Sequence, residues 1–352
     1  MKKTLFTLLL ICYLFATNSA SSQTFYNASN PFFQYMGRGD FSNVNHPIFW
    51  APGVQIIFSF KGNSCIIDLT DENLYNKNLN YIQLIVDGKY SRFKLKEKES
   101  KISLNELKDS IHSVIICKTT ESNIGYLQFN GVTCSELLPP PALPERKIEC
   151  FGNSITCGTG SDMEEIPCGK GEWQDQHNAY MSYGAQTARA LKAQVHLTSV
   201  SGIGLMHSCC DMKVIMPQIY DKINLRDNLI QWDFSKYQPD VVTICLGQND
   251  GFQDQKTFCS NYIHFIQSLR KVYPTTRIVL LTSPMADEKL TQNMKSNLTI
   301  IAKESNESGD HKVSTFFFSR SYNGGCDNHP SLAEHQLIAA ELTTYLKRLM
   351  NW

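Results

Sequence analysis

Three polar residues that could together cleave an ester lie at the ends of predicted elements far apart in the chain. Ser154 follows the predicted buried strand 147–151, Asn249 follows the predicted buried strand 241–246, and His329 precedes a long helical pattern. A serine hydroxyl is a weak nucleophile until a neighbouring imidazole takes its proton. A side-chain amide can stabilise the negative charge that develops on a carbonyl oxygen. These residue types predict acyl transfer that needs no metal.

Each residue also has an ordinary structural explanation. Ser154 lies in a Gly-Asn-Ser sequence, which alone is commonly a turn, and Asn249 with Asp250 is ordinary loop composition. A single histidine before a proline, such as His329, is usually structural. Only the ordered set is specific, and we interpret Asp250 as structural.

Strand and helix patterns alternate around these residues, which predicts a doubly wound parallel sheet with helices on both faces. Open sheets of this kind place their ligand sites at the carboxyl ends of the strands, where the candidate residues lie. The expected strands cover about 147–151, 195–200, 240–246, 277–283 and 312–318, and the expected helices about 178–193, 256–272, 290–305 and 331–350.

The preceding part of the chain has a different pattern. Residues 23–138 contain short strand-like runs separated by Gly, Asn and Asp turns, without helices. This pattern predicts an all-β sandwich of the jelly-roll kind. The proline-rich segment 139–146 is expected to be a stiff linker, so residues 147–352 form the predicted catalytic domain.

The N-terminus predicts export. Residues 1–22 carry two lysines, an apolar run over 5–16 and then small residues, as a secretory signal peptide does. We therefore expect a secreted, periplasmic or cell-surface protein, with no later run apolar enough to span a membrane. The chain has 12 cysteines, and eleven remain once Cys12, in the predicted signal peptide, is set aside. Because eleven is odd, at least one thiol should be unpaired. No Cys-x-x-Cys pair occurs, which favours disulfides and buried thiols over a structural metal.

The charge balance bears on the ligand. Thirty-three basic residues match 33 acidic ones, so no long-range field draws the protein to nucleic acid or to an anionic membrane. A neutral glycan fits such a protein at least as well. Trp173, Tyr183 and Trp232 could line a sugar platform, although aromatic side chains more often pack in a core. The sequence does not indicate which oligomeric state the protein adopts.

The ordered blocks resemble those of the SGNH, or GDSL-type, hydrolases, and they are most similar to family 2 of the carbohydrate esterases. The similarity covers nearly the whole mature chain. The motifs that carry it are Gly152-Asn153-Ser154-Ile155-Thr156-Cys157-Gly158, Tyr180-Met181-Ser182-Tyr183-Gly184-Ala185, Val200-Ser201-Gly202, Gly247-Gln248-Asn249-Asp250, Asp327-Asn328-His329 and, in the N-terminal part, Gly37-Arg38 and Asp87-Gly88.

The resemblance implies a role for each motif residue. Ser154 would be the nucleophile that forms an acyl-enzyme, and His329 the general base and acid. Asp327 would orient the imidazole, unless a backbone carbonyl does so, because here one residue separates acid and histidine and the family more usually has two. The amides of Ser154 and Gly202 and the side chain of Asn249 would form the oxyanion hole. No cofactor is implied.

The implied activity is that of a secreted serine esterase that removes O-acetyl groups from polysaccharides such as xylan or glucomannan. One alternative is a glycan-binding protein that has lost its activity, which the intact Ser154, Asn249 and His329 argue against. A lipid or thioester hydrolase is a second alternative, although no long apolar lid segment is visible. Asn153, where many relatives have aspartate, removes a charge beside the nucleophile.

Overall fold

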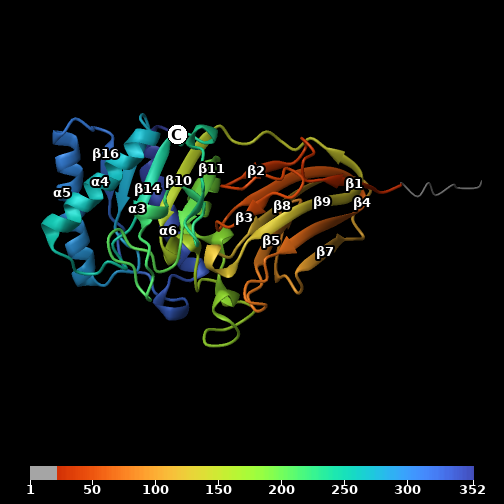
Figure 1. Cartoon of the computed structure of the whole chain (residues 1–352), viewed down its shortest axis with the longest axis horizontal. Helices are drawn as coiled ribbons and strands as arrows, with labels where there is room; N and C mark the ends of the chain where they lie inside the picture. The colour runs from red at the N-terminus through yellow and green to blue at the C-terminus, as the bar shows by residue number, and fades with distance from the viewer. Residues whose placement is uncertain (1–21) are drawn as a thin grey trace, which may run out of the picture.

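The computed structural model describes residues 22–352, so the predicted signal peptide lies outside them but for its last residue. Two sheets of different kinds follow one another along the chain (Figure 1). A nine-stranded antiparallel sheet comes first, and a five-stranded parallel sheet with helices follows. The predicted fold class, an all-β sandwich followed by a doubly wound α/β sheet, is confirmed.

The N-terminal sheet is organised around one long strand, β4 (Gln55–Asp71). Its first half pairs with β8 (Ser110–Lys118) and its second half with β7 (Glu99–Leu104), while β9 (Leu127–Leu138) pairs with both halves. The register shifts near Gly62, so the buried side chains change parity there. The other strands are β1 (Thr24–Asn27), β2 (Gln34–Met36), β3 (Ile48–Phe49), β5 (Tyr81–Val86) and β6 (Lys89–Lys94).

The C-terminal sheet has the strand order β11-β10-β14-β15-β16, and every pairing is parallel. The chain leaves β10 toward β11 on one side and later adds β14 on the other, so β10 lies at the topological switch point where such sheets bind ligands. The strands are β10 (Arg146–Gly152), β11 (Ala193–Ser199), β14 (Val241–Cys245), β15 (Arg277–Leu281) and β16 (Val313–Phe316).

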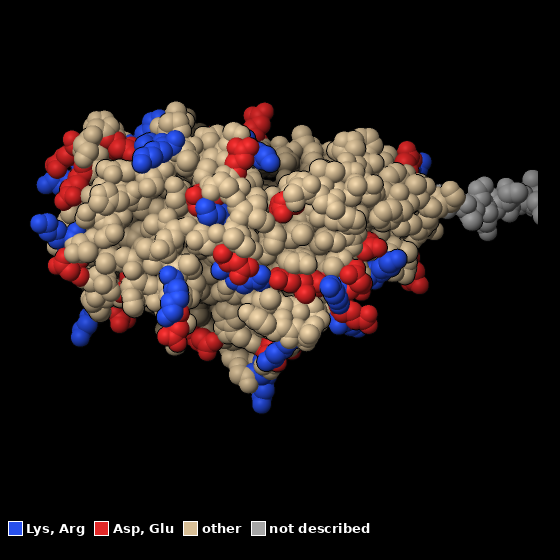
Figure 2. All heavy atoms as spheres, in the orientation of Figure 1, with Lys and Arg blue, Asp and Glu red and all other residues tan. Residues whose placement is uncertain are grey.

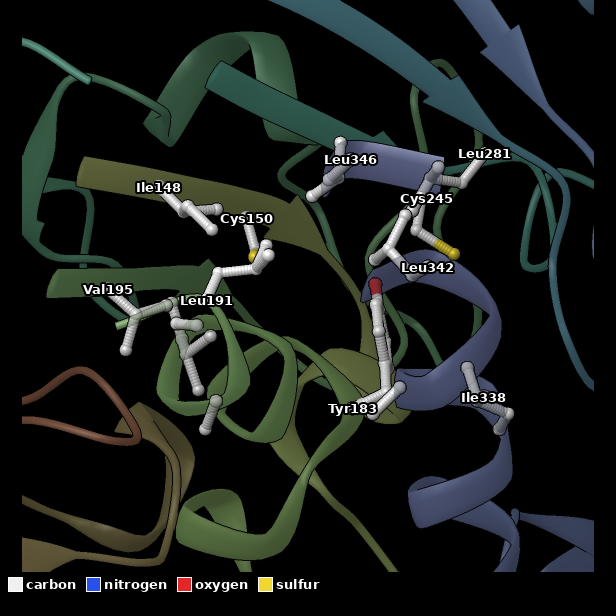
Figure 3. Packing of buried hydrophobic residues seen from close by; sticks show 14 of the residues in the cluster. Ile148, Cys150, Tyr183, Leu191, Val195, Cys245, Leu281, Ile338, Leu342 and Leu346 are labelled. Atoms are coloured by element: carbon white, nitrogen blue, oxygen red, sulfur yellow. The ribbon is translucent and has the colours of Figure 1, made fainter. Parts of the chain in front are cut away.

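Helices cover both faces of this sheet. On one face α2 (Tyr183–Ala190) packs against β10 and β11, and α6 (Leu332–Met350) packs beside α2 in a core that also includes Cys245 of β14 and Leu281 of β15 (Figure 3). On the other face α4 (Gln255–Val272) and α5 (Glu288–Glu307) share a core with side chains of β14, β15 and β16. The expected helix at 178–193 is instead a short 3-10 turn, η3 (Ala179–Met181), followed by α2. Ser331 and Glu334 form a capping box at the start of α6.

Several short elements were not predicted from the sequence. They are α1 (Ser154–Cys157), α3 (Met216–Ile219), the hairpin of β12 (Lys222–Asn224) and β13 (Leu229–Gln231), and the 3-10 turns η1 (Ser122–Ile124), η2 (Trp173–Gln176), η4 (Phe234–Lys236) and η5 (Cys326–Asn328). No helix in residues 22–352 has the length and hydropathy that a bilayer crossing requires. On the face shown in Figure 2, acidic and basic side chains are interspersed among uncharged ones.

Buried polar contacts join the two sheets. Arg38, from the loop after β2, is almost fully buried and donates to the Glu149 carboxylate on β10 at 2.7 Å. The same guanidinium donates to the carbonyls of Tyr220 and Lys222. These contacts fix the sandwich to β10, the strand that leads into the turn presenting Ser154.

Candidate active site

A tight turn at the end of β10 presents Ser154. Asn153 caps α1, because its side-chain oxygen accepts the Ile155 amide at 3.1 Å. A Cβ at Gly152 would come within 2.0 Å of the Thr156 hydroxyl, so only glycine fits before the turn. Ser154 is 8% exposed and lines a cavity. Neutral Asn153 therefore still makes the capping hydrogen bond that an aspartate would make.

His329 completes a dyad with Ser154. Its Nε2 lies 2.8 Å from the Ser154 Oγ, although 175 residues separate the two in sequence. Burial lowers the pKa of His329, opposed in part by the carbonyl of Cys326, which Nδ1 contacts at 3.2 Å. With the proton on Nδ1 donated to that carbonyl, Nε2 is free to accept the serine proton. The imidazole is thus held neutral and oriented, as a general base must be.

The carbonyl of Cys326 occupies the place where an orienting carboxylate was predicted. Within residues 22–352 no hydrogen bond joins the Asp327 carboxylate to the imidazole ring. Asp327 adopts a left-handed conformation with φ 51°, which turns the chain toward His329. Its carboxylate lines the cavity and raises the pKa of His329 through its charge. Of the two alternatives for orienting the imidazole, the geometry therefore favours the backbone carbonyl over Asp327.

The loop that supplies this carbonyl is anchored on both sides. A disulfide joins Cys326 to Cys168, and the Cys326 amide donates to the Gly160 carbonyl at 2.8 Å. The Gly325 amide donates to the carbonyl of His329 itself at 2.7 Å. The histidine is thus held by its own loop and by the disulfide rather than by a carboxylate.

The predicted oxyanion donors surround the same cavity as the dyad. One N–H of the Asn249 carboxamide donates to the Ile203 carbonyl at 2.8 Å, which fixes the group and leaves its second N–H for a ligand. Gly202 has φ 82°, and a Cβ there would lie 2.9 Å from the Cys209 sulfur. Asp250, predicted to be structural, accepts hydrogen bonds from the backbone amides of residues 205–207, in the loop that follows Gly202. Ser154, Gly202 and Asn249 thus converge on one space.

The cavity is about 500 Å³ and its walls are mostly uncharged. Trp173, from η2, is 44% exposed and lines it, with its ring edge-on to His177. Asp327 contributes the one carboxylate among the described lining residues. The lining residues beyond the dyad and the oxyanion donors are Asn123, Trp173, Ser201, Cys209, Cys210, Met212, Gln248, Met285 and Asp327.

Two of the three predicted sugar-binding aromatics are not in the cavity. Tyr183 is fully buried among apolar core side chains (Figure 3). Its hydroxyl pairs with Thr156 at 2.9 Å and its ring stacks on His335. Trp232 is 6% exposed and packs beneath the guanidinium of Arg38. The prediction was wrong for both, because their rings fill the interior. Trp173 is the one that a ligand can reach.

Some cavity residues carried no recognisable signal in the sequence. Asn123 comes from the N-terminal sandwich, and Cys209 and Cys210 are joined by a disulfide between neighbours. The other described cysteines, seven in all, are free and buried, in line with the predicted unpaired thiol. Within residues 22–352 no three His, Cys, Asp or Glu side chains are grouped to hold a metal.

Comparisons with known protein families match both parts of the chain. Residues 35–141 match the model of the carbohydrate esterase 2 N-terminal domain, and residues 150–331 match that of the GDSL-like lipase/acylhydrolase family. The second match covers more than half of the chain.

Individual relatives agree. An acetylxylan esterase / glucomannan deacetylase of Cellvibrio japonicus is 31% identical over 99% of this chain and 100% of its own length. The cellulase/esterase CelE of Acetivibrio thermocellus is 35% identical over 92% of this chain, which spans only 40% of that protein.

Solved structures give the same result. A family two carbohydrate esterase from Clostridium thermocellum, in complex with cellohexaose, matches with a TM-score of 0.83 and 32% identity over 91% of this chain and 99% of that one. Another from Cellvibrio japonicus matches with a TM-score of 0.85 and 28% identity over 94% and 99%. The chain therefore belongs to the GDSL-like acylhydrolases and, among them, to carbohydrate esterase family 2.

Proposed function

We propose that this carbohydrate esterase removes O-acetyl groups from neutral polysaccharides such as xylan or glucomannan. The observation that carries the proposal is the 2.8 Å contact between the Ser154 Oγ and the His329 Nε2, beside Gly202 and Asn249 in one cavity. Nucleophile, base and oxyanion donors are the parts that ester hydrolysis requires.

The reaction follows from these positions. As Ser154 attacks the acetyl carbon, its proton passes to Nε2 of His329, and the carbonyl electrons move onto the oxygen. The backbone amides of Ser154 and Gly202 and the Asn249 side chain stabilise that oxyanion. Collapse expels the sugar oxygen, which takes the proton from His329, and leaves an acetyl-serine. Water, activated by the same imidazole, then releases acetate.

The cavity walls favour a sugar as the leaving group. Trp173 offers an exposed ring on which a pyranose can stack, and the amide of Asn123 offers donors and an acceptor for hydroxyl groups. Because Asn123 comes from the sandwich, that domain would form one side of the cleft. The relative solved with cellohexaose binds a neutral glucan, which supports a neutral chain as the ligand here.

We also propose that the protein works outside the cytoplasm. Its predicted signal peptide supports export, and so does the Cys168–Cys326 disulfide beside the catalytic histidine, since disulfides persist in oxidising compartments. Fractionation of cells that express the full chain should find the esterase activity in the medium, in the periplasm or at the cell surface. Activity confined to the cytosol would contradict this location.

Acetate release tests the activity directly. The purified mature chain should release acetate from acetylated xylan or glucomannan and from 4-nitrophenyl acetate, and Ser154→Ala should lower both rates by about a millionfold. The variant should still bind the polysaccharide, because its cleft walls are unchanged. Equal rates for the variant would refute the mechanism. Binding without acetate release by the wild type would instead support the inactive glycan-binding alternative.

A further inference from the structure

Glu121 reaches from the sandwich into the framework of the active site. It is fully buried, and its Oε2 accepts the backbone amide of Ser201 at 2.6 Å. The same oxygen lies 3.5 Å from the thiol of Cys157. Ser201 immediately precedes Gly202, and Cys157 is the last residue of the short helix α1, which begins at Ser154. One carboxyl group thus contacts both segments that carry the reacting and charge-stabilising groups.

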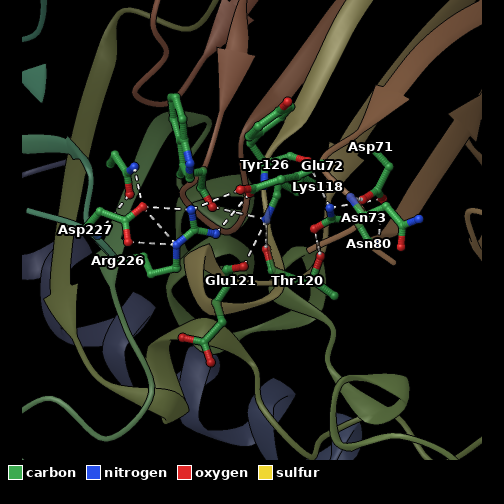
Figure 4. Close-up of polar contacts among 12 residues, drawn as sticks. Asp71, Glu72, Asn73, Asn80, Lys118, Thr120, Glu121, Tyr126, Arg226 and Asp227 are labelled. Carbon is green, nitrogen blue, oxygen red and sulfur yellow. Dashed lines mark hydrogen bonds and ion pairs between the residues drawn. The ribbon is translucent and has the colours of Figure 1, made fainter. Parts of the chain in front are cut away.

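The backbone around Glu121 is rigidly held. The ammonium of Lys118 donates to the carbonyls of Trp50, Thr120 and Glu121 at 3.1, 2.7 and 3.1 Å (Figure 4). The Thr120 hydroxyl donates to Asn80 at 2.6 Å. Burial lowers the pKa of Lys118 to about 7, which reflects how completely this cluster is removed from water. Because its backbone is fixed, the Glu121 side chain is a firm point of attachment.

The placement of this carboxyl is energetically costly for a purely structural contact. Burial raises the pKa of Glu121, and its Oε1 has no hydrogen-bond partner among the residues that the structure describes. A buried polar atom without a partner costs about 1–3 kcal/mol. An apolar side chain of the same length would fill this space without that cost, but it could not accept the Ser201 amide.

The Ser201 amide matters because the next amide along the chain belongs to Gly202. Fixing one peptide plane restricts where the following N–H can point, since only two backbone dihedrals lie between them. An oxyanion donor must be preorganised at about 2.7–3.1 Å from the position of the developing charge. The Gly202 loop has no helix or strand of its own at residues 200–204 to provide that rigidity.

We propose that Glu121 is a positioning residue, by which the sandwich holds the Gly202 loop at the distance from Ser154 that oxyanion stabilisation requires. This inference rests on the proposed ester hydrolysis. The sandwich thereby contributes to turnover as well as to substrate binding.

Paired substitutions test this role. Glu121→Met keeps the size of the side chain but removes the acceptor, and it should lower kcat for 4-nitrophenyl acetate by about 100-fold to 1000-fold, as loss of an oxyanion donor does. KM should change by less than about threefold, because the cleft walls stay in place. Glu121→Gln keeps an acceptor oxygen and should retain most of the kcat. A merely structural role would instead lower the fraction of active enzyme equally for both variants.

Ser122→Ala is the matched control, because Ser122 is equally buried and its hydroxyl has no partner among the described residues. It should keep the wild-type kcat. If Glu121→Met does not fold, Glu121→Asp, which withdraws the carboxyl by one methylene, should show the same loss in kcat. Wild-type kcat in a folded Met or Asp variant, or equal losses in Met and Gln, would overturn the proposal. Absence of Ser154-dependent turnover in the wild type would instead mean that the proposed function itself had failed.

Discussion

At the scale of single residues, the site orients its histidine with a neutral dipole. The carbonyl of Cys326 accepts a hydrogen bond from Nδ1–H of His329, so the imidazole keeps the tautomer that a general base needs. A carbonyl stabilises the imidazolium formed during catalysis less than a bonded carboxylate would. The charge of Asp327 at the cavity wall supplies part of the difference, because it raises the pKa of His329 without a hydrogen bond.

This arrangement predicts a modest and pH-dependent effect of Asp327→Asn. The base is active when neutral, and burial lowers the pKa of His329, so kcat/KM should fall only on the acid side, with a midpoint below 6.5. Removing the Asp327 charge should move that midpoint to still lower pH and reduce kcat at neutral pH by less than about tenfold. A pH–rate profile of both enzymes measures this. A loss near ten-thousandfold, typical of a lost triad aspartate, would show that the carboxylate orients the ring.

The residues that the structure brings together as candidate nucleophile, base and oxyanion donors were largely predictable from the sequence, and most of those that only line the cavity were not. Ser154, Gly202, Asn249 and His329 follow strands or precede a helix, and parallel strands bring such positions to one edge of a sheet. The exposure of an aromatic ring depends on neighbours distant in sequence. Nothing local distinguishes Trp173, which lines the cavity, from the buried Trp232.

At the scale of elements, the short turn η5 connects the disulfide to the catalytic histidine, because one of its residues contacts both. The side chain of Cys326 forms the disulfide with Cys168, and its carbonyl accepts a hydrogen bond from the His329 ring. Cys168 belongs to the segment 161–172, which lacks regular secondary structure. The disulfide therefore ties that segment to the catalytic loop.

Cys168→Ser should weaken both stability and turnover. Loss of a native disulfide typically costs about 2–5 kcal/mol, and the released η5 should let the imidazole depart from its position beside Ser154. Denaturant titrations and kcat for 4-nitrophenyl acetate measure the two effects. Cys259→Ser, at a buried free thiol on α4 away from the cavity, is the control and should leave kcat unchanged. Unaltered kcat in Cys168→Ser would show that the loop holds the histidine without the disulfide.

Element boundaries show where local patterns stop being informative. The five strands of the parallel sheet were expected close to their observed positions, because each is a short segment rich in apolar and β-branched residues. The region 178–193 reads as one helix, yet the chain turns at Ser182 so that η3 can contact the sandwich strand β8. That tertiary contact has no signal in the helix pattern itself.

At the scale of the whole molecule, the two domains share buried charges and should unfold together. Arg38 and Glu149 form an ion pair in which both side chains are almost fully buried, and Glu149 also accepts hydrogen bonds from Thr198 and Tyr273. Separating the domains would leave these charges without partners. This pair links the sandwich to β10, and hence to the turn that presents Ser154.

Arg38→Met should therefore destabilise the protein by about 3–5 kcal/mol, because it leaves the Glu149 carboxylate buried and without its counter-charge. The double variant Arg38→Met with Glu149→Gln removes both charges and should recover a large part of that loss, since a neutral amide still serves Thr198. Denaturant unfolding followed by tryptophan fluorescence and by esterase activity should show one coincident transition in the wild type. If Arg38→Met unfolds in two separated steps, the pair is what makes the domains cooperative. Losses that simply add in the double variant would show that the two side chains stabilise the interface independently.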